Sequence, residues 1–157
     1  MTGGDGVVRA WLFAGWTAAF AAGCAAGTPP PAALDEANEQ CRFCRMAVSD
    51  QRFAAQLVAP YEEPLFFDDL GCLRAFLEGK PKLPSGTVAY AADHQTRTWV
   101  PAERALYTRN DAVATPMGSH VVAHESAASL AADPDGRSGR LISIGELFPA
   151  GLPGAGR

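Results

Sequence analysis

The chain has 157 residues, 48% of them hydrophobic and 19% charged, and its 13 Lys and Arg against 17 Asp and Glu give a formal net charge of −4. That length fits one domain or two small lobes that share a core. The acidic balance excludes electrostatic binding to nucleic acid, which needs a clustered basic surface. Four cysteines are too few for a disulfide-dense scaffold, so their spacing is more informative than their number.

The N-terminal segment, residues 1–23, has the pattern of a signal peptide. Residues 10–22 carry no charge, and they are too few for a membrane span, which needs about 20 residues. The run ends in Ala22-Gly23-Cys24, and small residues before a cysteine are typical of a bacterial lipobox. We therefore expect lipidation of Cys24 and anchoring to a bacterial membrane outside the cytoplasm, facing the periplasm from the outer membrane in a Gram-negative cell. The alternatives are an ordinary cleaved signal and an uncleaved anchor.

The rest of the chain divides by composition into a linker, a folded body and a tail. Residues 24–40 are small, Pro-rich and acidic, which predicts a tether behind the lipidated cysteine. Residues 41–150 form the expected folded domain, with lobes at about 41–82 and 86–148. Residues 151–157 have little to bury and are expected to be disordered.

Strands are predicted over residues 53–59 and 64–67, followed by a helix over residues 70–78. Asp68-Asp69 offers capping oxygens at the start of this helix, and Gly79 ends it. The spacing of its apolar residues places one stripe against the strands. This stripe comprises Leu70, Leu73, Phe76 and Leu77.

The second half repeats this organisation in outline. The pattern predicts four strands and one helix, at residues 87–92, 98–100, 105–108, 119–123 and, for the helix, 125–132. Residues 65–77 and 120–132 share a strand, an acidic turn and a helix, which suggests an internal duplication. Because the connections are short, we expect an α+β fold of two small lobes with mostly antiparallel strands.

The block Cys41-Arg42-Phe43-Cys44-Arg45-Met46 places two thiols and a thioether within six residues. Two cysteines separated by two residues can bind one ion or form a redox disulfide. A thioether is a soft neutral donor that suits Cu(I), whereas zinc sites use thiolate, imidazole or carboxylate. Met117 lies between Pro116 and Gly118 in a predicted loop and is a second candidate thioether. The candidate Cu(I) ligands are Cys41, Cys44, Met46 and Met117.

Other interpretations of these residues remain open. Cys41 and Cys44 are compatible with a structural disulfide or with a membrane-tethered thiol–disulfide oxidoreductase. Cys72 lies on the apolar side of the predicted helix and is expected to be buried packing. A zinc-stabilised binding module would combine the three thiols with one histidine. Taken singly, each of the three histidines, His94, His120 and His124, is expected to be a surface side chain.

The sequence resembles the NosL family, the accessory lipoproteins of nitrous oxide reductase maturation. The resemblance is carried by the lipobox, the CRFCRM block, the turn from Phe67 to Cys72, and the Thr115-Pro116-Met117-Gly118 loop. It implies a monomeric Cu(I) metallochaperone of two related ββαβ-type lobes, with no catalysis of its own. It also implies delivery of copper towards the reductase, with an ABC-type membrane complex as a partner. Cys41 and Met117 are the ligands that the resemblance favours most.

The chain departs from the family pattern at one position in this block. Arg45 stands where the family typically has glycine, so the motif ends in CRM in place of CGM. A cation beside the thiols is expected to lower their pKa and favour thiolate. The substitution also leaves the backbone path through the block open.

Overall fold

The computed structural model describes Met1 and residues 27–154. The expected signal peptide beyond Met1, the expected lipidation site Cys24 and residues 155–157 lie outside the described residues. Within the described part of the chain, no helix is long and apolar enough to cross a membrane.

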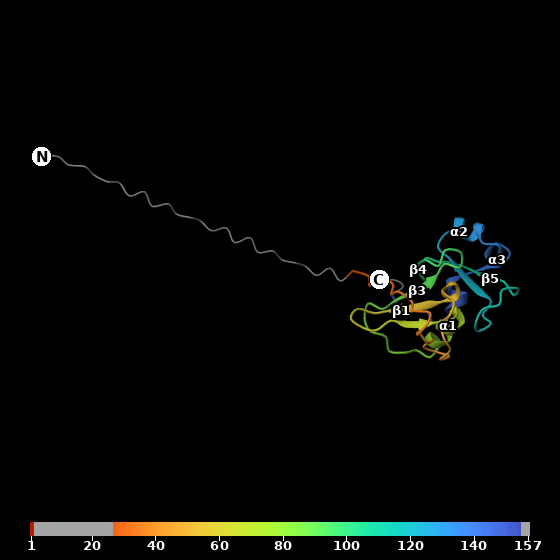
Figure 1. The fold of residues 1–157 in the computed structure, drawn as a ribbon, viewed down its shortest axis with the longest axis horizontal. Helices are drawn as coiled ribbons and strands as arrows, with labels where there is room; N and C mark the ends of the chain where they lie inside the picture. The colour runs from red at the N-terminus through yellow and green to blue at the C-terminus, as the bar shows by residue number, and fades with distance from the viewer. Residues whose placement is uncertain (2–26, 155–157) are drawn as a thin grey trace.

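The first half of the body is a four-stranded antiparallel sheet with one covering helix (Figure 1). A short 3-10 helix, η1 (Gln51–Phe53), precedes it. The strands are arranged in the order β2-β1-β3-β4, and α1 connects β2 to β3. The bounds are β1 (Ala55–Val58), β2 (Leu65–Phe67), α1 (Leu70–Glu78), β3 (Val88–Ala92) and β4 (Trp99–Pro101).

The second half is a three-stranded antiparallel sheet in the order β6-β5-β7. Its connection from β6 to β7 carries two short helices, and a last helix follows β7. The bounds are β5 (Leu106–Arg109), β6 (Val121–His124), α2 (Ala127–Ala132), α3 (Pro134–Arg137), β7 (Arg140–Ile142) and α4 (Ile144–Leu147).

The two sheets share one topology, since each runs strand, strand, helix, strand, with the first strand in the middle of the three. This confirms the expected α+β class with antiparallel strands, and it agrees with the suggested duplication. Strands β3 and β4 belong to the first sheet although they follow residue 86, where the second lobe was expected to begin. One apolar core continues from the first sheet through Tyr107 and Leu147 of the second half.

Helix α1 forms where the sequence predicts it, from Leu70 to Glu78. Asp69 caps it by accepting a hydrogen bond from the Gly71 N–H at 2.6 Å. Leu70, Leu73 and Leu77 are buried, as the apolar spacing predicts. The helix therefore has a fixed start, and this start is where the candidate site lies.

Part of the predicted tether contacts the body. The Gln56 side chain, fully buried in β1, accepts from the Ala32 N–H at 2.8 Å and donates to the Ala32 carbonyl at 3.1 Å. The Tyr90 hydroxyl donates to the Pro29 carbonyl at 2.6 Å. The chain is thus attached to the first sheet from about Pro29 onwards.

Candidate metal centre

The segment from Cys41 to Met46 is a closed loop next to β2. An isolated bridge pairs Gln40 with Ala47, and the Cys41 N–H donates to the Met46 carbonyl at 2.7 Å. The Arg42 N–H donates to the Phe66 carbonyl at 2.7 Å, which attaches the loop to the strand. These bonds hold Cys41 fully buried, whereas Cys44 stays half-buried at the surface.

Arg45 is in the left-handed region, with φ +69°. Glycine adopts this conformation without the steric cost that a Cβ imposes. The loop therefore keeps a backbone path suited to glycine although an arginine occupies the position. The Arg45 N–H donates to the Cys41 carbonyl at 3.0 Å, so the strained residue helps to close the loop.

Arg45→Gly is expected to raise the free energy of unfolding by about 0.5–1 kcal/mol, because it removes the left-handed strain. Chemical denaturation of the reduced protein measures this. Arg45→Ala is the matched control, since it removes the charge but keeps the Cβ. Equal stability of the two variants would show that the left-handed backbone at this position carries no free-energy cost for a residue with a Cβ.

Three thiols and one carboxylate converge between this loop and the start of α1. Cys41, Cys44, Asp68 and Cys72 each offer a ligand atom, and these atoms all lie within 4.8 Å of one another. The Cys44 Sγ lies 3.5 Å and 3.6 Å from the two Asp68 carboxylate oxygens. We name this group the thiol cluster. The sequence predicted its first two members, Cys41 and Cys44.

Cys72 and Asp68 are the members that sequence reasoning did not assign to the site. Cys72 is 1% exposed, which agrees with the expected burial, but it faces the other thiols as well as the core. Asp68 directly precedes the capping residue, and the sequence assigned both carboxylates of this turn to capping. Only Asp69 caps α1. A helix start needs one capping residue and the sequence offers two adjacent aspartates, so the surplus carboxylate of Asp68 was the signal for another role.

The two buried thiols are held protonated by their surroundings. Burial raises the pKa of Cys41, and a hydrogen bond with Asp68 adds to this effect. Burial also raises the pKa of Cys72, and the Asp68 carboxylate and Cys41 raise it further. The expectation that Arg45 lowers the thiol pKa is therefore wrong for these two cysteines, because Arg45 is exposed and burial dominates.

The Met117 loop docks on the first turn of α1. Asp69 is fully buried, and while one of its oxygens caps α1, the other accepts from the Met117 N–H at 3.0 Å. A Cβ added at Gly71 would lie 3.0 Å from both an Asp69 oxygen and the Ser119 Cβ, so the loop and the helix approach closely. Asp69 thus joins the second half of the chain to the helix that carries Cys72.

Both candidate thioether residues keep exposed side chains. Met46 is 55% exposed and Met117 is 43% exposed. The structure brings the Met117 backbone to the start of α1 and the Met46 backbone to the loop of Cys41. Their role as copper ligands stays a prediction.

The histidines form a different group. His94 and His124 are 5% and 0% exposed, so the expectation of surface side chains is wrong for both. The His94 Nδ1 and the His124 Nε2 lie 2.7 Å and 2.8 Å from one oxygen of the buried Asp133. We name these three residues the His–Asp cluster. His120 instead lies with its Nδ1 2.8 Å from the Val113 carbonyl oxygen.

The His–Asp cluster is arranged as a hydrogen-bond network. Burial opposes ionisation of Asp133, but hydrogen bonds from His124 and His94 outweigh it and lower its pKa. The ionised carboxylate accepts from both rings, and within residues 27–154 the second nitrogen of each ring is buried without a partner. A histidine that binds a metal through one ring nitrogen usually donates through the other, so the geometry favours two histidine rings that share one carboxylate over an ion bound between the three side chains.

Comparison with known proteins agrees with this fold. The model of the NosL family matches residues 31–150. The chain belongs to the NosL family. It is also similar to the crystal structure of the copper chaperone NosL from Shewanella denitrificans, with a TM-score of 0.57 and 16% identity, over 78% of this chain and 100% of that chain. No curated protein sequence gives a match.

The family assignment confirms the resemblance inferred from the CRFCRM block and the Met117 loop. At 16% identity the NosL crystal structure establishes the shared fold. The roles of individual residues in this NosL-family protein therefore rest on the geometry described above.

Proposed function

We propose that this protein is a lipid-anchored extracytoplasmic metallochaperone that binds Cu(I) and transfers it to a partner protein. The observation that carries the proposal is the convergence of three thiols at the start of α1, to which Asp69 also attaches the Met117 loop. In the proposed ligand set, Cys41, Cys44 and Met117 bind the ion and Met46 supports them. Cys72 is a further candidate from the same cluster.

The donor atoms suit Cu(I) as the cargo. Thiolate and thioether sulfurs are soft ligands, and soft ligands select Cu(I) among biological metals. No histidine belongs to the thiol cluster in the described residues, so a zinc site here would need the Asp68 carboxylate as its fourth ligand in place of an imidazole. Cys44 is only half-buried, so the cluster can be reached from the surface, as stepwise ligand exchange with a partner requires.

Copper loading on this site is coupled to proton release. The pKa values of Cys41 and Cys72 are raised in the free protein, so these thiols are protonated at neutral pH. Binding as thiolate releases their protons.

The family suggests the client of the copper. The resemblance to the NosL family implies a role in the maturation of nitrous oxide reductase. We propose that the copper is delivered towards this enzyme and that an ABC-type membrane complex is a partner in the delivery. Proximity of the gene to a nitrous oxide reductase gene would support this client. The protein itself is proposed to have no catalytic activity.

The test is anaerobic titration of the reduced soluble domain with Cu(I) against a competing chelator. Cys41→Ser and Met117→Ile are each expected to weaken binding by at least about tenfold, or 1.4 kcal/mol. Leu141→Ala, at an exposed position of β7, is the control and should bind as the original does. Unchanged affinity in both ligand variants would contradict the proposed site.

A thiol–disulfide oxidoreductase remains the alternative, because the three thiols are close enough for exchange reactions. Such enzymes place their reactive cysteine at a helix N-terminus, whereas Cys41 and Cys44 lie in a loop. A mixed disulfide trapped with a partner in Cys44→Ser, together with an oxidising reduction potential, would favour this alternative over the chaperone.

A further inference from the structure

The described body begins very close to the proposed lipid anchor. Cys24 precedes Gly27 by three residues, which can span at most about 11 Å. From Pro29 onwards the chain is hydrogen-bonded to Tyr90 and Gln56. A lipidated Cys24 therefore leaves only a few residues of free chain, so one particular face of the body has to lie near the bilayer.

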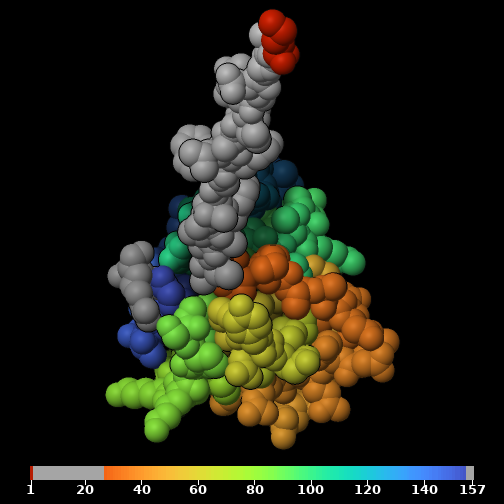
Figure 2. Space-filling model, turned by 90° about the vertical axis from the view of Figure 1, so that its left-hand side faces the viewer, coloured from red at the N-terminus to blue at the C-terminus, as the bar shows by residue number. Residues whose placement is uncertain are grey.

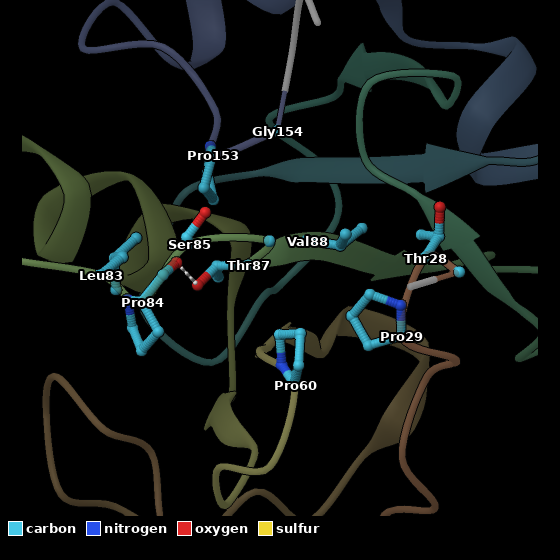
Figure 3. A pocket seen from close by; sticks show the side chains of 12 residues that line it. Thr28, Pro29, Pro60, Leu83, Pro84, Ser85, Thr87, Val88, Pro153 and Gly154 are labelled. Carbon is cyan, nitrogen blue, oxygen red and sulfur yellow. Dashed lines mark hydrogen bonds between the residues drawn. The ribbon is translucent and has the colours of Figure 1, made fainter. Parts of the chain in front are cut away.

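The face in question surrounds a hollow in which both ends of the described body meet. Gly27 and Pro29 line it together with Gly154, Pro60 of the β1–β2 turn and Leu83 of the α1–β3 loop (Figure 3). Figure 2 shows the yellow turn and the green loop side by side with the orange N-terminal segment. We name the turn, the loop and residues 27–29 the anchor face.

The side chains of the anchor face include groups that suit a lipid headgroup region. Tyr61, at the tip of the β1–β2 turn, is fully exposed at 106%, and tyrosine is enriched at membrane interfaces. Lys80 and Lys82 are exposed in the α1–β3 loop and are the only lysines of the sequence. Glu62 and Glu63 in the β1–β2 turn balance the two lysine charges. Attachment of the protein to the bilayer therefore depends on the lipid at Cys24 and not on the charge of the anchor face.

The thiol cluster lies at the opposite end of the same elements. Ala55 pairs with Phe67 and Leu57 with Leu65, so the β1–β2 turn is at one end of this hairpin and Asp68 is at the other. Helix α1 also starts at the thiol cluster and ends at the α1–β3 loop, eight residues later, or about 12 Å along its axis. Helices α2 and α3 also lie at the end of the body away from the orange N-terminal segment (Figure 1).

We propose that the anchor face lies against the bilayer, with Tyr61 at the headgroup level, and that the thiol cluster points away from the membrane. The proposal rests on lipidation of Cys24, which is part of the proposed function. This orientation presents the copper site to a partner in the aqueous compartment.

Fluorescence quenching by brominated phospholipid tests the orientation in the membrane-derived full-length protein. The protein is placed in vesicles of phosphatidylethanolamine and phosphatidylglycerol, and Trp99→Phe removes the background of the mature chain. In this background, Tyr61→Trp is expected to lose about half of its emission with brominated lipid. Ala128→Trp, on the exposed side of α2, is the matched control and should be unaffected.

Mass spectrometry of the same sample separates the two proposals. A lipidated mass with equal quenching at both positions, or none at position 61, would overturn the orientation and leave the chaperone intact. A mass without lipid would overturn the anchor and the orientation together, while the Cu(I) titration of the soluble domain still decides the copper site.

Discussion

Replacing Asp133 by alanine is expected to lower the free energy of unfolding by about 2–5 kcal/mol, because each buried polar group left without its partner costs about 1–3 kcal/mol. The His94 and His124 rings would lose their common acceptor at 2.7 Å and 2.8 Å. The Asp135 N–H would also lose its acceptor at the start of α3. Urea unfolding at neutral pH measures the loss.

Two further variants serve as controls for Asp133→Ala. Asp135→Ala removes an exposed carboxylate from the next turn and should change stability by less than about 0.5 kcal/mol. Asp133→Asn keeps an oxygen for capping and for one histidine, so its loss should be smaller than that of alanine. A similar loss in Asp133→Ala and Asp135→Ala would contradict the network.

The same carboxylate predicts a pH dependence. Its pKa in the folded protein lies below the ordinary value of 3.8, so ionised Asp133 contributes stability that is fully present above that value. The contribution is lost as the pH falls through the lowered pKa. The stability difference between the original protein and Asp133→Asn should therefore shrink on acidification below 3.8.

Gly136→Ala is expected to lower the free energy of unfolding by about 3 kcal/mol through overpacking. A Cβ at this position would meet the Cε1 and Nε2 atoms of the His124 ring, and the Leu130 side chain at 3.0 Å. The ring cannot retreat, because it is fully buried and bonded to Asp133. Thermal unfolding by circular dichroism measures the effect.

The chain offers a matched control for this substitution. Gly145 is also helical, but a Cβ there would meet nothing within 4 Å. Gly145→Ala should therefore raise stability by up to about 1 kcal/mol through helix propensity. Loss of stability in both variants would show that alanine is disfavoured in these short helices for reasons other than the histidine.

The elements that the sequence predicted well are those that carry their own signals. Helix α1 has an apolar stripe, capping aspartates and a terminating glycine, and it runs over the predicted residues. Strand β7 has three residues, and its pairing with β5 forms it rather than any local pattern. It was not predicted, and neither were α3 and α4, which have four residues each.

The candidate site was predictable where its residues are adjacent in sequence. Cys41 and Cys44 form one motif, and Cys44 contacts Asp68 only because the loop pairs with β2 through Phe66. Cys72 reads as packing from its place on α1, and only the folded loop shows that it faces the other thiols. His94 and His124 likewise meet through the junction of β3 and β6, which no local pattern reveals.

The two oxygens of Asp69 have a consequence for newly made protein. One oxygen accepts from the Gly71 N–H in α1, and the other accepts from the Met117 N–H in the loop that leads into β6. On the proposed ligand set, a chain that has folded only its first half carries the thiols without this thioether. High-affinity loading then reports that both halves are complete, and bound copper in turn favours the finished fold by mass action. Cargo uptake would thus act as a maturation checkpoint for the chaperone itself.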